Sequence, residues 1–221
     1  MRNVQVELTG KMPFLMHADN IEWADRMEDW KNDPDNKAAS KAGDDRTPPW
    51  RWIGALNYDD PEKGVVTVPS EYIMRNIMSG GASVPTGKGK ATFKSQSQSG
   101  ILCAEFHWCF HNNGKPIRMV DIQKMFKLKT FNDHKKVAQD LGFDLFVKRV
   151  KIGNAKHIRV RPRFDQWSAK GELIITDDSI TDQVLTRILD IGGRLKGLGD
   201  WRPSAPQSPG PFGTFEAKLI S

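Results

Sequence analysis

The sequence has few cysteines and no long apolar run. Its only cysteines, Cys103 and Cys109, lie six positions apart in a stretch that alternates like a strand. At about 3.3 Å per residue they are too far apart within one strand to form a disulfide, so we expect reduced thiols and a cytoplasmic protein. No apolar run reaches the ~18 residues of a membrane helix. Glu7 and Lys11 interrupt the apolar positions near the start, which argues against a signal peptide, and we expect no membrane partner.

Acidic residues are missing from two stretches of the chain. There is no Asp or Glu between Tyr72 and Ala104, and residues 148–163 hold seven bases and no acid. The formal net charge is +6, while residues 19–62 hold twelve acids and six bases, a net of −6, so the rest of the chain carries +12. Clustered positive charge predicts a polyanionic partner, and nucleic acid is the first choice. A merely solvated basic face is the alternative.

The overall composition is that of a globular protein. Hydrophobic residues make up 38% and charged residues 27% of 221, with 19 Gly and 13 Pro. This balance fits neither a disordered nor a fibrous chain. Without an internal repeat or a clear linker, we expect a single domain over residues 1–221.

Local patterns predict a mixed set of elements. Period-two alternation predicts strands over 4–8, 101–110, 143–151, 156–163, 171–176 and 214–219, and pairs 50–53 with 65–68. Helical spacing and caps predict helices from Asp19 or Asn20 to Trp30, from Ser70 to Gly80, and from Ser179 to Gly192–Gly193, with a helical insertion over 120–142. Residues 31–49 and 85–100 read as loops. The order strand, helix, strands, helix, strand predicts an α+β fold of the ferredoxin-like (RRM-like) kind, with an antiparallel sheet and insertions at about 19–62 and 111–142.

The strongest candidate for a site is the glycine-rich stretch Gly192–Pro203. Gly193, Gly197 and Gly199 alternate there with Arg194, Lys196 and Arg202, which suits close approach of a backbone to phosphate. A helix end followed by an ordinary turn is the alternative. A Walker A loop is excluded because no Gly-Lys-Ser/Thr is present and a helix precedes the stretch, so ATP hydrolysis is not expected.

This C-terminal arrangement resembles the RAMP superfamily, the RNA-binding proteins of CRISPR effector complexes. The resemblance rests on the helix, the glycine-rich stretch and the closing strand from Phe212 to Glu216, on Val6–Met16 with its apolar bend at Pro13, and on Val68–Arg75 at the start of a helix. Arg159–Trp167 and Gly197–Pro203 are also similar to a stand-alone variety of the superfamily found in bacteriophage genomes.

The resemblance implies a ferredoxin-like RNA-binding domain that assembles with copies of itself or with other RAMP-like subunits. A phage origin would place it in the cytoplasm of the bacterial host. Some RAMP ribonucleases keep a histidine general base after the first strand, where this chain has His17. Asp19 and Asp25 lie in the general region of the acidic catalytic residue of other members, but no motif fixes either one.

The second candidate is the predicted basic hairpin. Period two places Arg159, Arg161 and Arg163 on one face of a strand, with Ile158 and Val160 opposite, and Arg149 and Lys151 join them from the partner strand. A row of guanidinium groups suits a phosphate backbone. Trp167 and Trp201 can stack on bases, or else belong to the core.

A metal site and a catalytic site have weaker support. His107, Cys109 and His111 share a strand face with Cys103, but no Cys-x-x-Cys or helical His pair accompanies them. We expect no metal and no cofactor. His17 alone is a weak catalytic candidate, with a structural or exposed histidine as the alternative.

The sequence therefore predicts a non-catalytic protein that binds single-stranded RNA or DNA and self-associates head to tail, as a filament or a multi-subunit complex. The alternatives are a metal-independent endoribonuclease that uses His17 and a protein–protein assembly subunit. The predicted nucleic-acid-binding residues are Arg75, Lys88, Lys90, Lys94, Arg149, Lys151, Arg159, Arg161, Arg163, Trp167, Gly193, Arg194, Lys196, Gly197, Gly199, Trp201 and Arg202.

Overall fold

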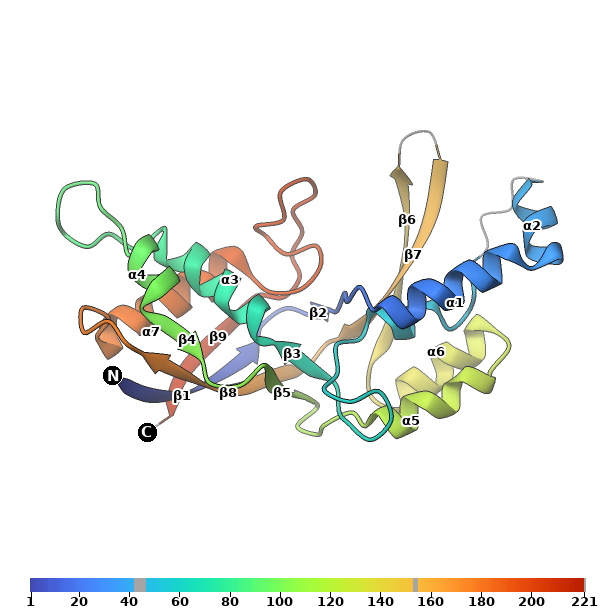
Figure 1. The fold of residues 1–221 in the computed structure, drawn as a ribbon, viewed down its shortest axis with the longest axis horizontal. Helices are drawn as coiled ribbons and strands as arrows, with labels where there is room; N and C mark the ends of the chain where they lie inside the picture. Colours follow the sequence, from blue (N-terminus) through green and yellow to red (C-terminus); the bar gives the residue numbers. More distant parts are fainter. Residues whose placement is uncertain (42–46, 153–154, 221) are drawn as a thin grey trace.

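The computed structural model is an α+β protein with two antiparallel sheets arranged along its long axis (Figure 1). It describes residues 1–41, 47–152 and 155–220, with the side chains in these ranges apart from 39–41, 149–152 and 155–157. The larger sheet has six strands and the smaller has three. Among the described residues, no helix combines the length and the apolar character needed to cross a membrane.

The larger sheet is built from strands distant in the sequence. Its strands are β1 (Arg2–Gly10), β3 (Thr67–Pro69), β4 (Ile101–Cys103), β5 (His107–Asn112), β8 (Trp167–Ile175) and β9 (Phe215–Ile220). They lie in the order β3-β5-β8-β1-β9, and β4 also pairs with β8. The two long strands β1 and β8 are central, with Val6 opposite Gly171. The first and last strands of the chain are therefore neighbours.

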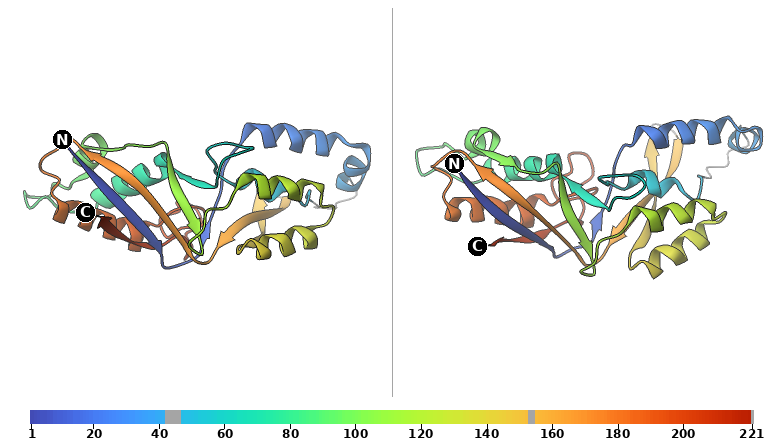
Figure 2. Two further views of the ribbon diagram at one scale, coloured as in Figure 1. Left: turned by 90° about the horizontal axis from the view of Figure 1, so that it is seen from below. Right: turned by 60° about the horizontal axis from the view of Figure 1, so that its bottom comes forward.

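Helices cover one face of this sheet (Figure 2). They are α3 (Ser70–Gly81), α4 (Lys94–Ser99) and α7 (Asp182–Ile191). Val6 and Leu8 of β1 are buried, as are Ile77 of α3 and Ile188 of α7. The opposite face is polar, and Lys170 pairs with Glu7 across it at 3.0 Å. The described strands place no Phe, Tyr or Trp ring on this polar face, where the only aromatic rings of these strands are the imidazoles of His107 and His111 on β5.

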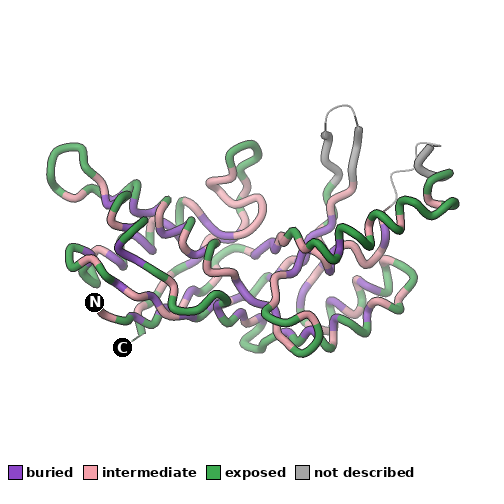
Figure 3. The backbone as a smooth tube through the Cα atoms, in the orientation of Figure 1, coloured by how far each residue is buried: buried purple, intermediate pink, exposed green. Residues whose placement is uncertain are grey.

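The smaller sheet carries the insertions. Its strands are β2 (Phe14–Leu15), β6 (Asp144–Ile152) and β7 (Ala155–Phe164), in the order β2-β7-β6. Around it lie α1 (Ile21–Asn32), α2 (Pro34–Lys41), the 3₁₀ helix η1 (Arg51–Ala55), α5 (Met119–Gln123), the 3₁₀ helix η2 (Lys124–Lys127) and α6 (Phe131–Asp140). Rings from both sheets, Phe14, Phe110, Phe164 and Trp167, pack together with neighbouring centroids 4.9–6.3 Å apart. Buried segments run through the junction of the two sheets (Figure 3).

Three sequence-based assignments were wrong. Residues 34–41, expected as loop, form α2, because the Asp33 carboxylate accepts hydrogen bonds from the amides of Asp35 and Asn36 and Pro34 suits the first helical turn. Residues 94–99 form α4, whose buried Ser97 packs against Gly81. Residues 51–55 form η1 and do not pair with 65–68, since the buried side chain of Trp52 anchors this turn in the core.

Two boundaries also differ from expectation. Thr181, and not Ser179, caps α7, because its hydroxyl accepts a hydrogen bond from the Val184 amide. That helix does not end at Gly192–Gly193 but continues as a π-helical turn, η3 (Gly192–Lys196), up to Gly197 at φ +69°. The single strand expected over 101–110 is divided into β4 and β5. The predicted turn at Gly153–Asn154 lies outside the described residues.

The buried His134 should make stability depend on pH. Trp52 Nε1 donates to its Nδ1 at 3.1 Å, and burial lowers the pKa of His134 below its ordinary value of 6.5. In the unfolded chain His134 takes up a proton near pH 6.5, whereas in the folded chain it does so only at lower pH. The free energy of unfolding therefore falls as the pH drops from 7 to 5. We expect the free energy of unfolding of His134→Gln, measured with urea, to fall less between pH 7 and pH 5 than that of the original protein. Equal falls would show that His134 does not cause the pH dependence.

Candidate functional site

The glycine-rich stretch is fixed tightly against the rest of the protein. A Cβ on Gly193 would lie 2.2 Å from the Phe215 carbonyl oxygen, and one on Gly199 would lie 2.4 Å from that of Leu15. Asn76 of α3 donates from Nδ2 to the carbonyl oxygens of Gly192 and Gly197, both at 2.9 Å. These glycines are thus needed for contacts inside the protein, and their predicted role in approaching a phosphate has no support in this geometry.

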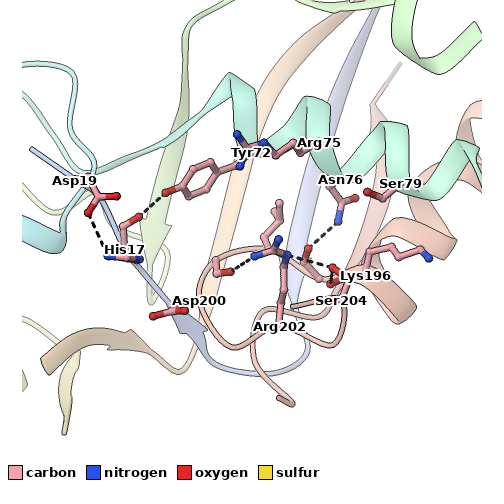
Figure 4. Close-up of a pocket in the computed structure, with 13 residues that line it drawn as sticks. His17, Asp19, Tyr72, Arg75, Asn76, Ser79, Lys196, Asp200, Arg202 and Ser204 are labelled. Atoms are coloured by element: carbon pink, nitrogen blue, oxygen red, sulfur yellow. Dashed lines mark hydrogen bonds and ion pairs between the residues drawn. The ribbon is translucent and has the colours of Figure 1, made fainter. Parts of the chain in front are cut away.

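A hollow of about 300 Å³ lies between α3 and this stretch, and we call it the loop hollow (Figure 4). Three cations line it, Arg75 from α3 with Lys196 and Arg202 from the glycine-rich stretch. Arg202 is held by hydrogen bonds from Nη1 to the Gly199 carbonyl at 3.0 Å and from Nε to the Ser204 hydroxyl at 3.1 Å. These bonds hold its guanidinium at the wall of the hollow.

A second hollow of about 310 Å³ adjoins the first, and we call it the arginine hollow. Arg51 of η1 and Arg159 and Arg161 of β7 line it, opposite residues of α1. The two hollows share His17 and Asp19. Together they form what we call the cationic cleft, which joins the two sheets.

His17 stands where the two hollows meet. Tyr72 donates its hydroxyl proton to the His17 carbonyl oxygen, and His17 Nε2 lies 3.4 Å from Asp19 Oδ1. Burial lowers the pKa of His17, Arg161 lowers it further, and the carboxylates of Asp200 and Asp19 oppose this shift. Because the result lies below 6.5, the imidazole is neutral at pH 7. The cleft therefore holds an uncharged imidazole among cations.

The predicted arginine row has a more specific arrangement than expected. Arg161 is almost fully buried, and its Nε donates to Asp200 Oδ2 at 2.9 Å. Arg163 pairs with Asp165 at 2.8 Å and lies 3.7 Å from Asp144. Arg161 and Arg163 thus already have carboxylate partners. Arg159 is the member of the row that lines the cleft without these pairings.

The two tryptophans differ in position. Trp167 is 3% exposed, its Nε1 donates to the Met12 carbonyl, and its ring packs in the core, so its predicted stacking on a base is wrong. Trp201 is half-buried, with Lys148 Nζ 4.2 Å from its ring centroid and Phe146 at its edge. One face of the Trp201 ring is therefore already covered by a cation.

Other predicted residues do not gather in the cleft. Lys88, Lys90 and Lys94 are exposed, and the loop over 85–92 lies at the end of the molecule away from the β6–β7 hairpin (Figure 1). Arg194 is exposed and lies 3.4 Å from Asp190 on the preceding helical turn. The side chains of Arg149 and Lys151 are outside the described set. The predicted residues that the structure describes are thus divided between the cleft and positions away from it.

Sequence reasoning missed several residues that line the cleft. Tyr72, Arg75, Asn76 and Ser79 lie at i, i+3, i+4 and i+7 on the face of α3 that borders the loop hollow. This spacing alone indicates that the four side chains share one helix face, but only Arg75 is among the residues that the sequence predicts to bind nucleic acid. Arg51 and Asp200 gave none, because a contact between distant segments brings each of them to the cleft.

Cys103 of β4 and the residues His107, Cys109 and His111 of β5 are not arranged as a metal site. No group of three His, Cys, Asp or Glu in the described part of the chain is placed to hold a metal ion. His107 Nδ1 lies 3.1 Å from the Thr67 hydroxyl, and burial raises the pKa of the Cys103 thiol to about 11.

Comparison with known proteins adds nothing to this description of the site. No model of a protein family matches the chain, and no curated protein sequence matches it.

Two glycines with similar positive φ angles should respond differently to alanine. Gly87 has φ +81° with open space around the added Cβ, whereas Gly199 has φ +77° and its Cβ would meet the Leu15 carbonyl. We expect Gly87→Ala to cost about 1–2 kcal/mol from the left-handed conformation alone, and Gly199→Ala to cost clearly more. Urea unfolding measures both, and equal costs would show that the glycine-rich stretch is loosely packed.

Proposed function

We propose that the chain binds single-stranded nucleic acid, RNA first, in the cationic cleft. The observation that carries this proposal is the charge of the cleft. Three cations line each hollow, making six, against two carboxylates, Asp19 and Asp200. Asp200 is already paired with Arg161, so the remaining cations favour an anionic ligand with repeated charges. A phosphate backbone that passes from one hollow to the next has this property.

The strand order supports a ferredoxin-like core of the RAMP kind. The order β9-β1-β8 with β4 and β5 beyond β8, and with α3 and α7 on one face, is that expected for two β-α-β units folded into one antiparallel sheet. The described strands of the polar face carry no Phe, Tyr or Trp ring, and the imidazole of His107 lies 3.1 Å from the Thr67 hydroxyl, which argues against base stacking on the open sheet. The cleft beside the glycine-rich stretch is the better site.

The dependence of binding on salt should locate the phosphate contacts. Each neutralised phosphate of a single strand contributes roughly −0.7 to the slope of log K against log salt. We expect the triple variant Arg75→Ala, Lys196→Ala, Arg159→Ala to flatten this slope by about two units, measured by the anisotropy of a labelled RNA.

The matched control removes three charges elsewhere. Lys88→Ala, Lys90→Ala, Lys94→Ala changes the net charge equally at exposed positions away from the cleft. Its slope should stay close to that of the original protein. Equal flattening in both triple variants would mean general electrostatic attraction and would contradict binding in the cleft.

A metal-independent endoribonuclease is the second candidate. The specific observation in its favour is the neutral His17 imidazole, which can accept a proton at pH 7 and lies among cations that can stabilise a phosphorane charge. Non-catalytic binding and RNA cleavage would use the same cleft and the same ligand. They differ in whether His17 takes a proton from the bound RNA. Head-to-tail self-association stays a prediction of the charge separation along the chain.

Substitution of His17 should change how binding depends on pH. A bound phosphate favours the imidazolium, so binding takes up a proton and affinity rises as pH falls from 8 to 6, by up to about tenfold per pH unit. We expect His17→Gln to flatten this rise, measured by anisotropy at each pH. A profile unchanged by the variant would place His17 away from the ligand. The same samples, with chelator and run on a gel, test the second candidate, because only cleavage that His17→Gln abolishes supports an endoribonuclease.

A further inference from the structure

The arginine hollow has two walls of different chemistry. Arg51 and Arg159 line one wall, from η1 and β7. Ile21, Ala24 and Met27 of α1 line the other. They follow one another at steps of three, so they lie along one side of the helix. The hollow therefore offers charge on one side and an apolar surface on the other.

The cationic wall crowds like charges together. Burial lowers the pKa of Arg51, and the charges of Arg159 and Arg161 lower it further, which places the three guanidinium groups within electrostatic reach of one another. Arg51 is held there by its hydrogen bond from Nη1 to the Thr47 hydroxyl at 3.2 Å. Asp200 neutralises Arg161, but Arg51 and Arg159 still repel each other. An anion between these two would relieve the repulsion.

The apolar wall is open to a ligand. Ile21 is 80% exposed at the start of α1, so its side chain is accessible to a ligand. Trp23, in contrast, is occupied, because its ring stacks on Phe126 at 4.7 Å with Arg26 above both rings. The surface available to a ligand is therefore aliphatic. It suits the flat face of a nucleobase.

We propose that the arginine hollow holds one unpaired nucleotide of the bound strand, with its phosphate on Arg51 and Arg159 and its base against Ile21, Ala24 and Met27. This inference rests on the proposed function and narrows it. A base inside a duplex is stacked and paired, so it cannot enter the hollow without being extruded. The ligand is a strand with a free base at this point, and duplex of the same sequence binds less tightly.

A scan with abasic sites tests the contact. A length series first identifies the shortest RNA that binds fully, so that the strand cannot shift along the cleft. Each base of this RNA is then removed in turn while the phosphates are kept. We expect the removal of one base to lower affinity by about tenfold, the scale of one buried base contact, and removal of bases outside the cleft to have little effect.

Variants of α1 connect that position to the hollow. Ala24→Gln places a longer side chain in the hollow at an exposed helical position, and Ala38→Gln makes the same change at an exposed position of α2 away from it. In Ala24→Gln, removal of the base at the sensitive position should no longer lower affinity, because the Gln side chain already excludes this base from the hollow. In Ala38→Gln the tenfold effect should persist. Ile21→Gln, at another exposed position of α1, should weaken binding of the intact strand and reduce the effect of the abasic site.

The outcomes separate this inference from the proposed function. If the RNA binds and the abasic scan is flat, or if Ala24→Gln leaves the sensitive position unchanged, the base-binding role is refuted while binding in the cleft stands. If a duplex binds as tightly as the single strand, the proposal that the hollow holds an unpaired nucleotide is likewise refuted. If no RNA or DNA strand binds at low salt, the proposed function fails, and this inference fails with it.

Discussion

The ion pair between Arg161 and Asp200 determines how the two halves of the cleft are arranged. Arg161 belongs to the smaller sheet and its side chain is only 9% exposed, so its charge requires a partner nearby. Asp200 supplies that partner from the glycine-rich stretch. It is itself held by a hydrogen bond from its backbone N–H to the Leu15 carbonyl oxygen. The pair fixes the insertion against the core of the larger sheet. The aromatic cluster of Phe14, Phe110, Phe164 and Trp167 also joins the two sheets, so the ion pair and this cluster together position the two hollows.

The same pair sets the electrostatics around His17. Arg161 disfavours the imidazolium and Asp200 favours it, so their opposed effects leave burial as the largest cause of the lowered pKa. A histidine kept neutral in this way does not add to the repulsion between the neighbouring cations. An anion bound beside His17 would raise its pKa and favour uptake of a proton. The positive charge of the cleft at pH 7 therefore comes from its arginine and lysine side chains, and His17 would add to it on binding.

The parts of the fold that the sequence predicted are those with a strong local signal. Alternation located β1, β7 and β8, and apolar spacing located α3 and α7. The helix α4 was missed because its polar sequence gives no periodicity and its position depends on packing against Gly81. For the candidate site, the sequence singled out segments that line the cleft but not the contacts that their residues make within the protein. The glycines of the glycine-rich stretch contact protein, and the tryptophan after β7 belongs to the core, because tertiary contacts decide both.

The net charge of a segment says little about the cleft for the same reason. Residues 19–62 carry a net negative charge, yet this insertion supplies Arg51 and the apolar side of α1 to the cleft. Its acids Asp25, Glu28 and Asp29 are exposed and do not line the arginine hollow. A sum over a segment counts charges that point in different directions, whereas a ligand meets only those on one wall. The insertion is thus half of the proposed binding site, and the larger sheet by itself would lack the arginine hollow.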